Sequence, residues 1–425
     1  MRIAIVGGRV VDPAAGTERV ADVHLYAGKI AAIGAPPAQG SPERTIDARG
    51  LVVCPGLVDL AARLREPGFE HKATLESELD AACAGGVTSL ACPPDTDPPL
   101  DEPGLVEMLT YRARSQNRVR VHPVGALTQR LEGTELTEMN ELAEAGCVAF
   151  SQADRPLADT QVLLRAMQYA ATFGFAVWLS AQDAWLGRGG VAHDGEIATR
   201  LGLAGVPAIA ESVALATLIA LARETAVRLH VCRVSAAESV AMIRDAKRSG
   251  LSITCDVAVH HVHLCDIDIG WFDPLAHFVP PLRGARDRDA LRAGLLDGTI
   301  DAIASDHTPV DDDAKQLPFA ESEPGATALE LLLPLTLKWA SETGIGLPQA
   351  LACITSRAGD ALRVPHAGRI DVGAPADLCI FDPAAYWRVE RTALRSQGKN
   401  TPFLGLEMPA KVRLTLIDGQ VVYEA

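Results

Sequence analysis

Cys54-Pro55-Gly56-Leu57-Val58-Asp59-Leu60-Ala61-Ala62-Arg63-Leu64-Arg65-Glu66-Pro67-Gly68 is the stretch that decides the fold of this 425-residue chain. Its apolar run at 57–61 predicts a short buried strand. Charged side chains and a Pro-Gly pair follow at once, and such a pair marks a turn. The stretch therefore predicts the first strand of a larger sheet, with a polar segment at its carboxyl end.

Further apolar strands are predicted along the chain near 88–92, 120–126, 147–151, 175–180, 227–232, 251–256 and 300–305. Between most of them lie segments with apolar residues at helical spacing, at 73–84, 103–114, 160–173 and 235–248. Strands that alternate with helices in this way predict a TIM-type (β/α)₈ barrel of the α/β class. The rival is an open doubly wound sheet, which is weakened because no Gly-rich phosphate loop follows the first strand.

The two ends of the chain resemble each other. Residues 2–12 and 411–423 both alternate apolar and polar residues across a Gly turn, a pattern that predicts a β-hairpin. More strand-like segments lie at 22–33, 44–53 and 376–382. We therefore expect a small β-sandwich domain from residues 1–54 plus 366–425, and a barrel domain from residues 55–365.

Composition excludes several classes of protein. With 48% hydrophobic and 22% charged residues the chain can bury a large core. A net charge of −15 argues against binding to nucleic acid or to anionic membranes, which requires clustered Lys and Arg. The first residues lack the features of a signal peptide, and no run reaches the length of a membrane span. The nine cysteines show no paired spacing, so we expect reduced thiols in a soluble cytoplasmic protein.

The stretch from Cys54 to Gly68 closely resembles the signature of the dihydroorotases, zinc amidohydrolases whose pattern reads Asp-x-His-x-His-x-Arg-Glu-Pro-Gly. Asp59 and the residues 65–68 stand in place, but the two histidines are Ala61 and Arg63. The resemblance extends over almost the whole chain, to the segment 368–377 near the end. It implies an amidohydrolase barrel with its site at the carboxyl ends of the strands.

The resemblance implies six metal-ligand positions, and five of them hold unsuitable residues: Ala61, Arg63, Gln152, Ser180 and Arg233. Only Asp306 remains. The histidine that ends the last family motif is also replaced, by Val310. Zinc needs three or four N, O or S donors at roughly 2.0–2.3 Å, and arginine keeps its proton. We therefore expect no metal and no other cofactor.

Two of these replacements are cations. A dication about 4 Å from a guanidinium would be opposed by roughly 8 kcal/mol at an effective dielectric of 20. Asp306 would otherwise lack a countercharge. We predict that one or both of Arg63 and Arg233 occupy the former metal volume and pair with Asp306.

The resemblance also implies remnants of substrate binding. Arg65 matches the family arginine that grips the carboxylate of dihydroorotate, whereas Asp95 replaces a family asparagine and adds a negative charge. The alternative for Arg65 is a structural ion pair with Asp95 or Glu66. His307 is expected to be a packed residue rather than a working base, so no catalytic residue is predicted.

Two other constellations could carry chemistry. His261, His263 and Cys265 would share one face of a strand at a spacing that can bind metal, with His260 and Cys255 nearby, although the His-His pair matches a structural segment of the dihydroorotases. A metal-free triad of Ser180, His230 and Asp306 is also conceivable, but no Gly-x-Ser-x-Gly turn surrounds Ser180.

The acidic run 311–313 predicts a solvated loop over the barrel mouth that could contact a basic partner.

The pattern of loss is similar to that of the non-catalytic dihydroorotase homologues found beside bacterial aspartate transcarbamoylase. This resemblance implies that the chain is a structural subunit, partnered by the aspartate transcarbamoylase catalytic chain in an oligomer of the pyrimidine biosynthesis pathway. Two alternatives stay open. One is an active dihydroorotase or related cyclic amidohydrolase with a remodelled, metal-poor site. The other is a ligand-sensing barrel in which Arg65 holds a carboxylate metabolite without converting it.

Overall fold

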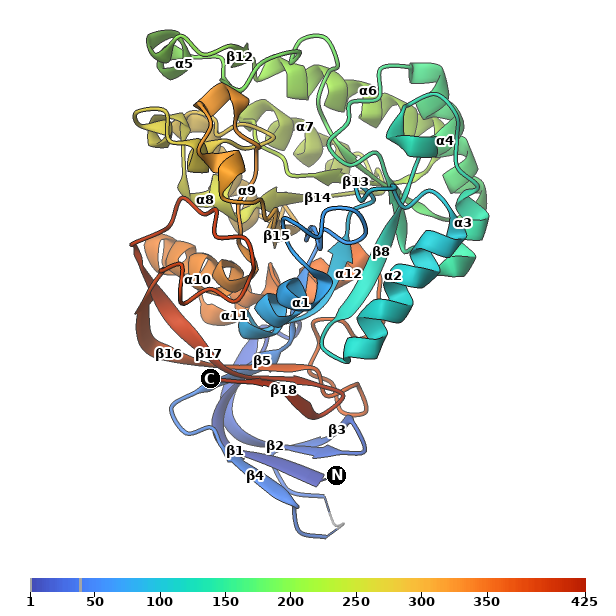
Figure 1. Cartoon of the computed structure of the whole chain (residues 1–425). Helices are drawn as coiled ribbons and strands as arrows, with labels where there is room; N and C mark the ends of the chain where they lie inside the picture. The colour runs from blue at the N-terminus through green and yellow to red at the C-terminus, as the bar shows by residue number, and fades with distance from the viewer. Residues whose placement is uncertain (1, 38–39) are drawn as a thin grey trace.

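The computed structural model describes residues 2–37 and 40–425. It shows a barrel with a separate sheet packed below it (Figure 1). The eight barrel strands are β6 (Leu57–Asp59), β7 (Val87–Cys92), β8 (Arg120–Ala126), β9 (Ala149–Ser151), β10 (Ala176–Ser180), β13 (Arg228–Cys232), β14 (Ile253–Ala258) and β15 (Ala302–Ala304). Each lies within a few residues of its predicted range, so the barrel is confirmed.

All seven pairings between neighbouring barrel strands are parallel, in the order β6 to β15 around the sheet. The ends of the sheet meet just beyond β6 and β15. There the His307 backbone N–H donates to Ala61 O at 3.1 Å, and His307 O accepts from Arg63 N at 2.9 Å. The two segments that close the barrel are therefore those that carry Arg63 and Asp306.

Helices link the strands, as parallel pairing requires. The predicted ones are α1 (Leu75–Ala84), α2 (Pro103–Gln116), α4 (Thr160–Phe173) and α7 (Ala237–Arg248). The others are α3 (Met139–Ala145), α5 (Glu196–Leu201), α6 (Ile209–Thr225), α8 (Val259–His263), α9 (Ala285–Leu296), α10 (Leu332–Thr343), α11 (Leu347–Ala352) and α12 (Ser356–Leu362), with a short strand pair β11 (Ala192–His193) and β12 (Gly205–Val206). Among the described residues, no helix combines the length and apolar character needed to cross a bilayer.

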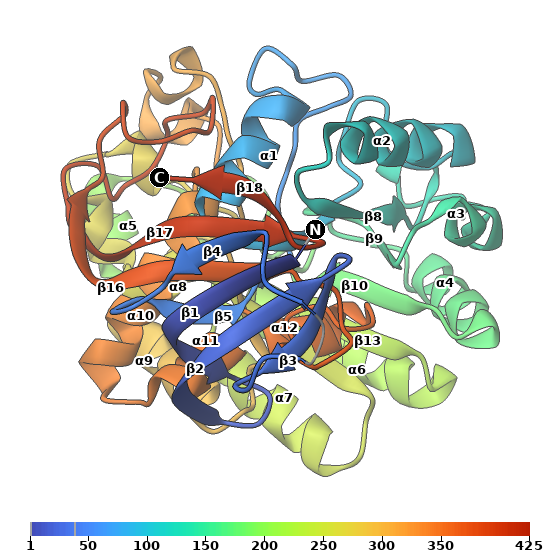
Figure 2. The same cartoon turned by 90° about the horizontal axis from the view of Figure 1, so that it is seen from below.

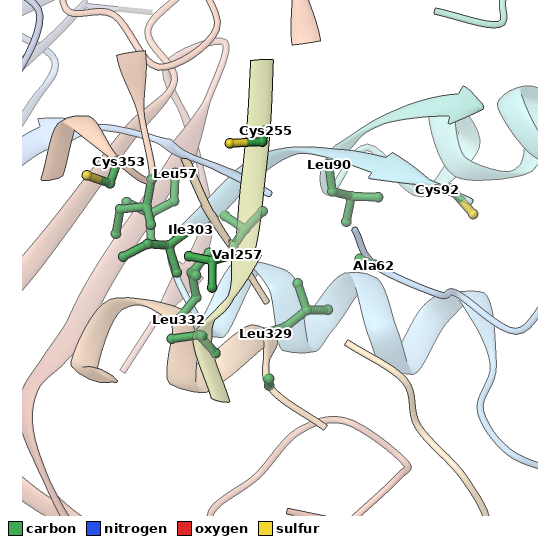
Figure 3. Close-up of a cluster of buried hydrophobic side chains, with 14 of the residues drawn as sticks. Leu57, Ala62, Leu90, Cys92, Cys255, Val257, Ile303, Leu329, Leu332 and Cys353 are labelled. Atoms are coloured by element: carbon green, nitrogen blue, oxygen red, sulfur yellow. The ribbon is translucent and has the colours of Figure 1, made fainter. Parts of the chain in front are cut away.

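The main core lies between the barrel strands and their helices. Figure 3 shows part of it, where Leu57, Val257 and Ile303 from three strands pack with Leu329, in the 3-10 turn before α10, and with Leu332, the first residue of α10. All five side chains are fully buried. Because this apolar packing holds the strands, the strand ends can carry charged groups without loss of the fold.

Both ends of the chain build the second sheet, seen from below in Figure 2. Its eight strands form one continuous sheet in the order β18-β17-β16-β5-β1-β2-β3, with β4 beside β1. Their bounds are β1 (Arg2–Asp12), β2 (Thr17–Tyr26), β3 (Lys29–Ile33), β4 (Arg44–Asp47), β5 (Val52–Pro55), β16 (Leu378–Arg388), β17 (Glu407–Ile417) and β18 (Gln420–Glu424). Both ends of the chain therefore build a separate β-sheet, as expected.

One predicted hairpin is correct and the other is wrong. Residues 411–423 turn back at Asp418-Gly419, where both residues have positive φ. Residues 2–12, however, form the single strand β1. The register with β2 jumps between Ile5 and Gly8, so the glycines make a bulge in one strand rather than a turn between two.

The segment 389–406 leaves the terminal sheet and packs along the barrel. Asn400 Nδ2 donates to Thr308 O at 3.0 Å, and Ser396 Oγ donates to Glu78 Oε2 at 2.7 Å. These buried contacts join the last part of the chain to α1 and to the loop after β15.

Candidate functional site

Four non-glycine residues around the barrel mouth have left-handed backbones. They are Arg65 (φ 63°), Ala153 (φ 52°), Arg233 (φ 52°) and Asp306 (φ 49°), and they follow β6, β9, β13 and β15. Such conformations cost free energy for a residue with a side chain and persist only where the surrounding structure fixes them. The loops after four strands are thus held in defined shapes that turn side chains toward one another.

The predicted pairing of both arginines with Asp306 is present. Nη1 of Arg63 lies 3.2 Å from Asp306 Oδ1, and Nη1 of Arg233 lies 3.0 Å from the same oxygen. All three side chains are about 5% exposed. Thr308 Oγ1 accepts a further hydrogen bond from Arg63 Nη1 at 2.9 Å. The one retained acidic group is therefore enclosed by two guanidiniums.

Two more carboxylates complete the cluster. Asp95 Oδ2 lies 2.7 Å from Arg63 Nε, so the negative charge that replaces the family asparagine is bound by Arg63. Asp154 pairs with both arginines, at 2.6 Å from Arg63 Nη2 and in closer contact with Arg233 Nη2. Three carboxylates thus surround two guanidiniums in a single ion cluster, which we call the mouth cluster: Arg63, Asp95, Asp154, Arg233 and Asp306.

Sequence reasoning missed Asp154. It follows Gln152 by two residues, but no motif marks it, and its role depends on two arginines that are 91 and 79 positions away along the chain. The left-handed Ala153 sets its direction. Only the assembled barrel brings the three residues together.

The charges of the cluster stabilise one another. Burial acts to lower the pKa of Arg63, but Asp95 and Asp154 outweigh it and hold that pKa above its ordinary value. The pKa of Arg233 is likewise raised by Asp154 and Asp306 against the effect of burial. Burial would raise the pKa of Asp95, yet the guanidinium of Arg63 holds it below the ordinary range. Both arginines therefore stay charged.

The residues at the family metal positions do not fit a zinc ion. Ala61 offers a methyl group, and Gln152 Oε1 already accepts a hydrogen bond from Thr128 Oγ1 at 3.0 Å. Ser180 Oγ accepts from Arg233 Nη2 at 2.5 Å. Asp306 is the one anionic donor left at these positions, and the guanidiniums of Arg63 and Arg233 both contact its Oδ1, so they take the place that a dication would need.

The structural ion pair expected for Arg65 is wrong. Asp95 is bound by Arg63, and Glu66 pairs with Arg112 and accepts Leu75 N–H at the start of α1, 2.8 Å away. Arg65 instead donates from Nε to Pro309 O at 2.8 Å and lies 5.9 Å from the ring of Phe69. Burial and the neighbouring Arg63 lower its pKa.

His307 is packed away from the mouth, as expected. Its Nδ1 accepts the backbone N–H of Ala328 at 3.1 Å, so Nε2 carries the proton and donates to Glu78 Oε2 at 2.6 Å. The side chains of His307 and Glu78 are fully buried. Both ring nitrogens are engaged, so His307 cannot serve as a base at the mouth.

The alternative metal site at His261, His263 and Cys265 is not assembled. Residues 259–263 form helix α8 rather than a strand, which turns the histidines apart. His261 Nε2 faces Pro280 O at 3.1 Å, and His263 Nε2 faces Leu335 O at 2.9 Å. A carbonyl partner requires a protonated nitrogen, so these atoms are unavailable to a metal.

The alternative triad is also not assembled. Ser180 contacts a guanidinium, which cannot take its proton. His230 is bound by Thr254 Oγ1 and Asp256 Oδ2, each at 2.8 Å. Cys232 lies close to this His-Asp pair, and burial raises the pKa of its thiol well above the ordinary value.

The acidic loop has an internal partner. Arg391 Nη2 lies 2.6 Å from Asp312, so the basic contact comes from the C-terminal segment of the same chain. Both side chains are at least half exposed. The loop is thus solvated as predicted, and this contact ties it to the segment 389–406.

Known proteins resemble this chain over its whole length. Residues 50–239 match a family model described as dihydro-orotase-like, and residues 214–423 match one described as the amidohydrolase family. A dihydroorotase-like protein of Pseudomonas aeruginosa is 45% identical over all of both chains, and a protein named dihydroorotase from Geobacter sp. is 38% identical over all of both. An L-hydantoinase (dihydropyrimidinase) structure from Arthrobacter aurescens shares the fold, with a TM-score of 0.89, 24% identity, and coverage of 99% of this chain and 96% of that one.

Proposed function

Because the chain belongs to the dihydroorotase-like family of amidohydrolases, we propose that it is a non-catalytic member, acting as a structural subunit of aspartate transcarbamoylase in pyrimidine biosynthesis. The observation that carries the non-catalytic part is the mouth cluster. Hydrolysis of a cyclic amide in this family uses a metal-activated water, and Asp306 is here neutralised by two arginines. The chain's own residues in the mouth offer neither a metal-binding donor set nor a free base.

The structural part of the proposal rests on a different argument. The resemblance of the losses to those of non-catalytic homologues beside aspartate transcarbamoylase supplies the partner. A large barrel that no longer catalyses a reaction still offers a rigid surface. If this surface binds only the assembled form of the partner, the binding stabilises that assembled form by mass action. Such complexes are symmetric, with large repeated interfaces.

Two measurements separate the parts of this proposal. Ring opening of dihydroorotate and metal content are assayed on the purified chain, with the Geobacter relative named dihydroorotase in parallel. We expect no turnover and no stoichiometric zinc. Turnover with tightly bound metal would instead support a working hydrolase with a remodelled site.

Co-expression with the aspartate transcarbamoylase catalytic chain tests the partner. We expect a mixed complex by light scattering coupled to gel filtration, and transferase activity that depends on the presence of this chain. A matched sample holding the double variant Arg248→Gln/Arg286→Gln, which alters two exposed charges, checks that assembly survives a simple change of net charge. If the transferase assembles and works equally well alone, the structural role is wrong.

One observation favours a second candidate, a ligand-sensing barrel. Among the described residues Arg65 has no ion-pair partner, although it is largely buried at the mouth. Calorimetric titration with dihydroorotate, on the wild type and on Arg65→Gln, tests it. Binding that is lost in the variant supports sensing, and no binding to either protein contradicts it.

A further inference from the structure

A cavity of about 660 Å³ lies on the flank of the molecule, between the end of α1, the start of α10 and strands β16–β18. These elements lie together where the terminal sheet meets the barrel (Figures 1 and 2). None of its lining residues belongs to the mouth cluster. Its volume is within the range of about 300–1,000 Å³ that is usual for small-molecule sites.

The cavity gathers cationic side chains on an acidic protein. Arg388, Arg395 and Lys411 line it, and no ion pair of theirs is found among the described residues. The whole chain carries a net charge of −15. Cations that line one concave surface without an ion pair attract an anion, and guanidiniums match phosphate oxygens in geometry.

Glu330 alone supplies an acidic side chain among the described residues that line this cavity. Its carboxylate binds the backbone, where it accepts the N–H groups of Arg395 at 2.8 Å and Ser396 at 3.2 Å. These bonds fix the backbone that carries Arg395. Leu333 and Pro334, in the first turn of α10, form part of the wall and bring the positive end of that helix to the cavity.

Two aromatic rings share the same cavity. Trp387 is held by a hydrogen bond from Nε1 to Ala410 O at 3.0 Å, and Tyr423 comes from the last strand of the sheet. Both side chains are partly exposed. A fixed aromatic face beside cations is the combination on which nucleic-acid bases stack while their phosphates are neutralised.

We propose that this flank cavity binds a nucleoside polyphosphate, with the phosphates on Arg388, Arg395 and Lys411 and the base against Trp387 and Tyr423. The site goes beyond the structural role proposed above and does not depend on it. Its chemistry needs neither the mouth cluster nor a partner chain.

Calorimetry on the full chain at low salt tests the site with three probes: uridine triphosphate, inorganic tripolyphosphate and uridine. We expect uridine triphosphate to bind in the micromolar range and tripolyphosphate to bind at least about tenfold more weakly, because it lacks the stacked base. Uridine alone should bind more weakly still. Arg395→Gln/Lys411→Gln should weaken uridine triphosphate at least about tenfold, and Trp387→Leu about fivefold or more.

The control is Arg248→Gln/Arg286→Gln, which also removes two positive charges, but from side chains on α7 and α9 that are about three-quarters exposed. It should bind as the wild type does. Circular dichroism checks that each variant is folded. Equal affinity for uridine triphosphate and tripolyphosphate overturns the nucleoside assignment, and equal weakening in the control pair, or no binding of uridine triphosphate at millimolar concentration, overturns the site.

Discussion

Arg233 is the residue on which the mouth cluster most depends, because it contacts Asp154 and Asp306 together and is 5% exposed. Removing one partner of a buried ion pair leaves an uncompensated charge. We predict that Arg233→Met lowers the free energy of unfolding by about 3 kcal/mol, at the lower end of such effects because Arg63 still faces both carboxylates. Urea denaturation followed by circular dichroism measures it.

Arg286→Met is the matched control for this substitution. Arg286 pairs with Glu238 at 2.8 Å, but its side chain is 79% exposed. Exposed pairs contribute at most about 1 kcal/mol. Equal losses in the two variants would mean that the mouth cluster contributes nothing special to stability.

Glu330 makes stability depend on pH. Burial raises its pKa from 4.5 to about 7, and nearby Glu78 adds to the rise, whereas the N–H groups of Arg395 and Ser396 and the charge of Lys399 oppose it. Between these values the folded state binds the extra proton, so stability is lost as pH rises through this window. We predict that the free energy of unfolding of Glu330→Gln, relative to wild type, increases by about 3 kcal/mol between pH 4.5 and pH 7.5.

Urea titrations of both proteins across that range measure this difference. Taking the difference removes the contribution of every other titrating group, provided that these groups are unaffected by the substitution. A difference that is flat with pH would show that Glu330 titrates normally.

Helix α1 begins with a reciprocal cap, which fixes the end of the loop that leads from β6 into this helix. Thr74 Oγ1 accepts Ser77 N–H at 3.2 Å, and Ser77 Oγ accepts Thr74 N–H at 3.2 Å. We predict that Thr74→Ala lowers the free energy of unfolding by about 1 kcal/mol. Thr172→Ala, in the exposed last turn of α4, should change it by less than about 0.5 kcal/mol in the same denaturation experiment. A smaller loss at Thr74 than at Thr172 would contradict the role of the cap.

Elements in which apolar residues recur at a clear strand or helix spacing could be predicted from the sequence, and short elements without such a spacing could not. The run 88–92 is fully buried in β7, and 160–173 is helix α4, because apolar spacing specifies both. Gly7-Gly8 allows either a turn or a bulge, and only pairing with β2 decides between them. Likewise 259–263 continues a strand pattern, yet the chain turns into α8 at the barrel rim.

The site follows the same rule. Arg63, Arg233 and Asp306 could be predicted as neighbours because each follows a barrel strand and the ends of parallel strands converge. The place of Asp154 in the cluster and the lack of an ion-pair partner for Arg65 among the described residues could not be predicted, because both depend on which carboxylate reaches which guanidinium. That choice is set by loop conformations of four left-handed residues that no local pattern encodes.

For the whole molecule, we expect that the stability does not depend on a bound metal. The ion pairs around Asp306 are internal, so chelation removes nothing that holds the strand ends together. We predict that dialysis against EDTA changes the thermal midpoint by less than about 1 °C, because a structural metal site would instead couple binding to folding. Differential scanning calorimetry with and without EDTA, then with added zinc, measures this. A midpoint that rises with zinc by several degrees would reveal a site that the cluster does not exclude.

Strand β5 pairs with β1 on one side and with β16 on the other, although β16 begins more than 300 residues later. During synthesis on the ribosome, the first five strands emerge long before β16, β17 and β18 exist. One edge of β5 therefore stays bare while the entire barrel is translated, and such edges invite intermolecular pairing. The nascent chain is consequently open to aggregation until β16 has been made.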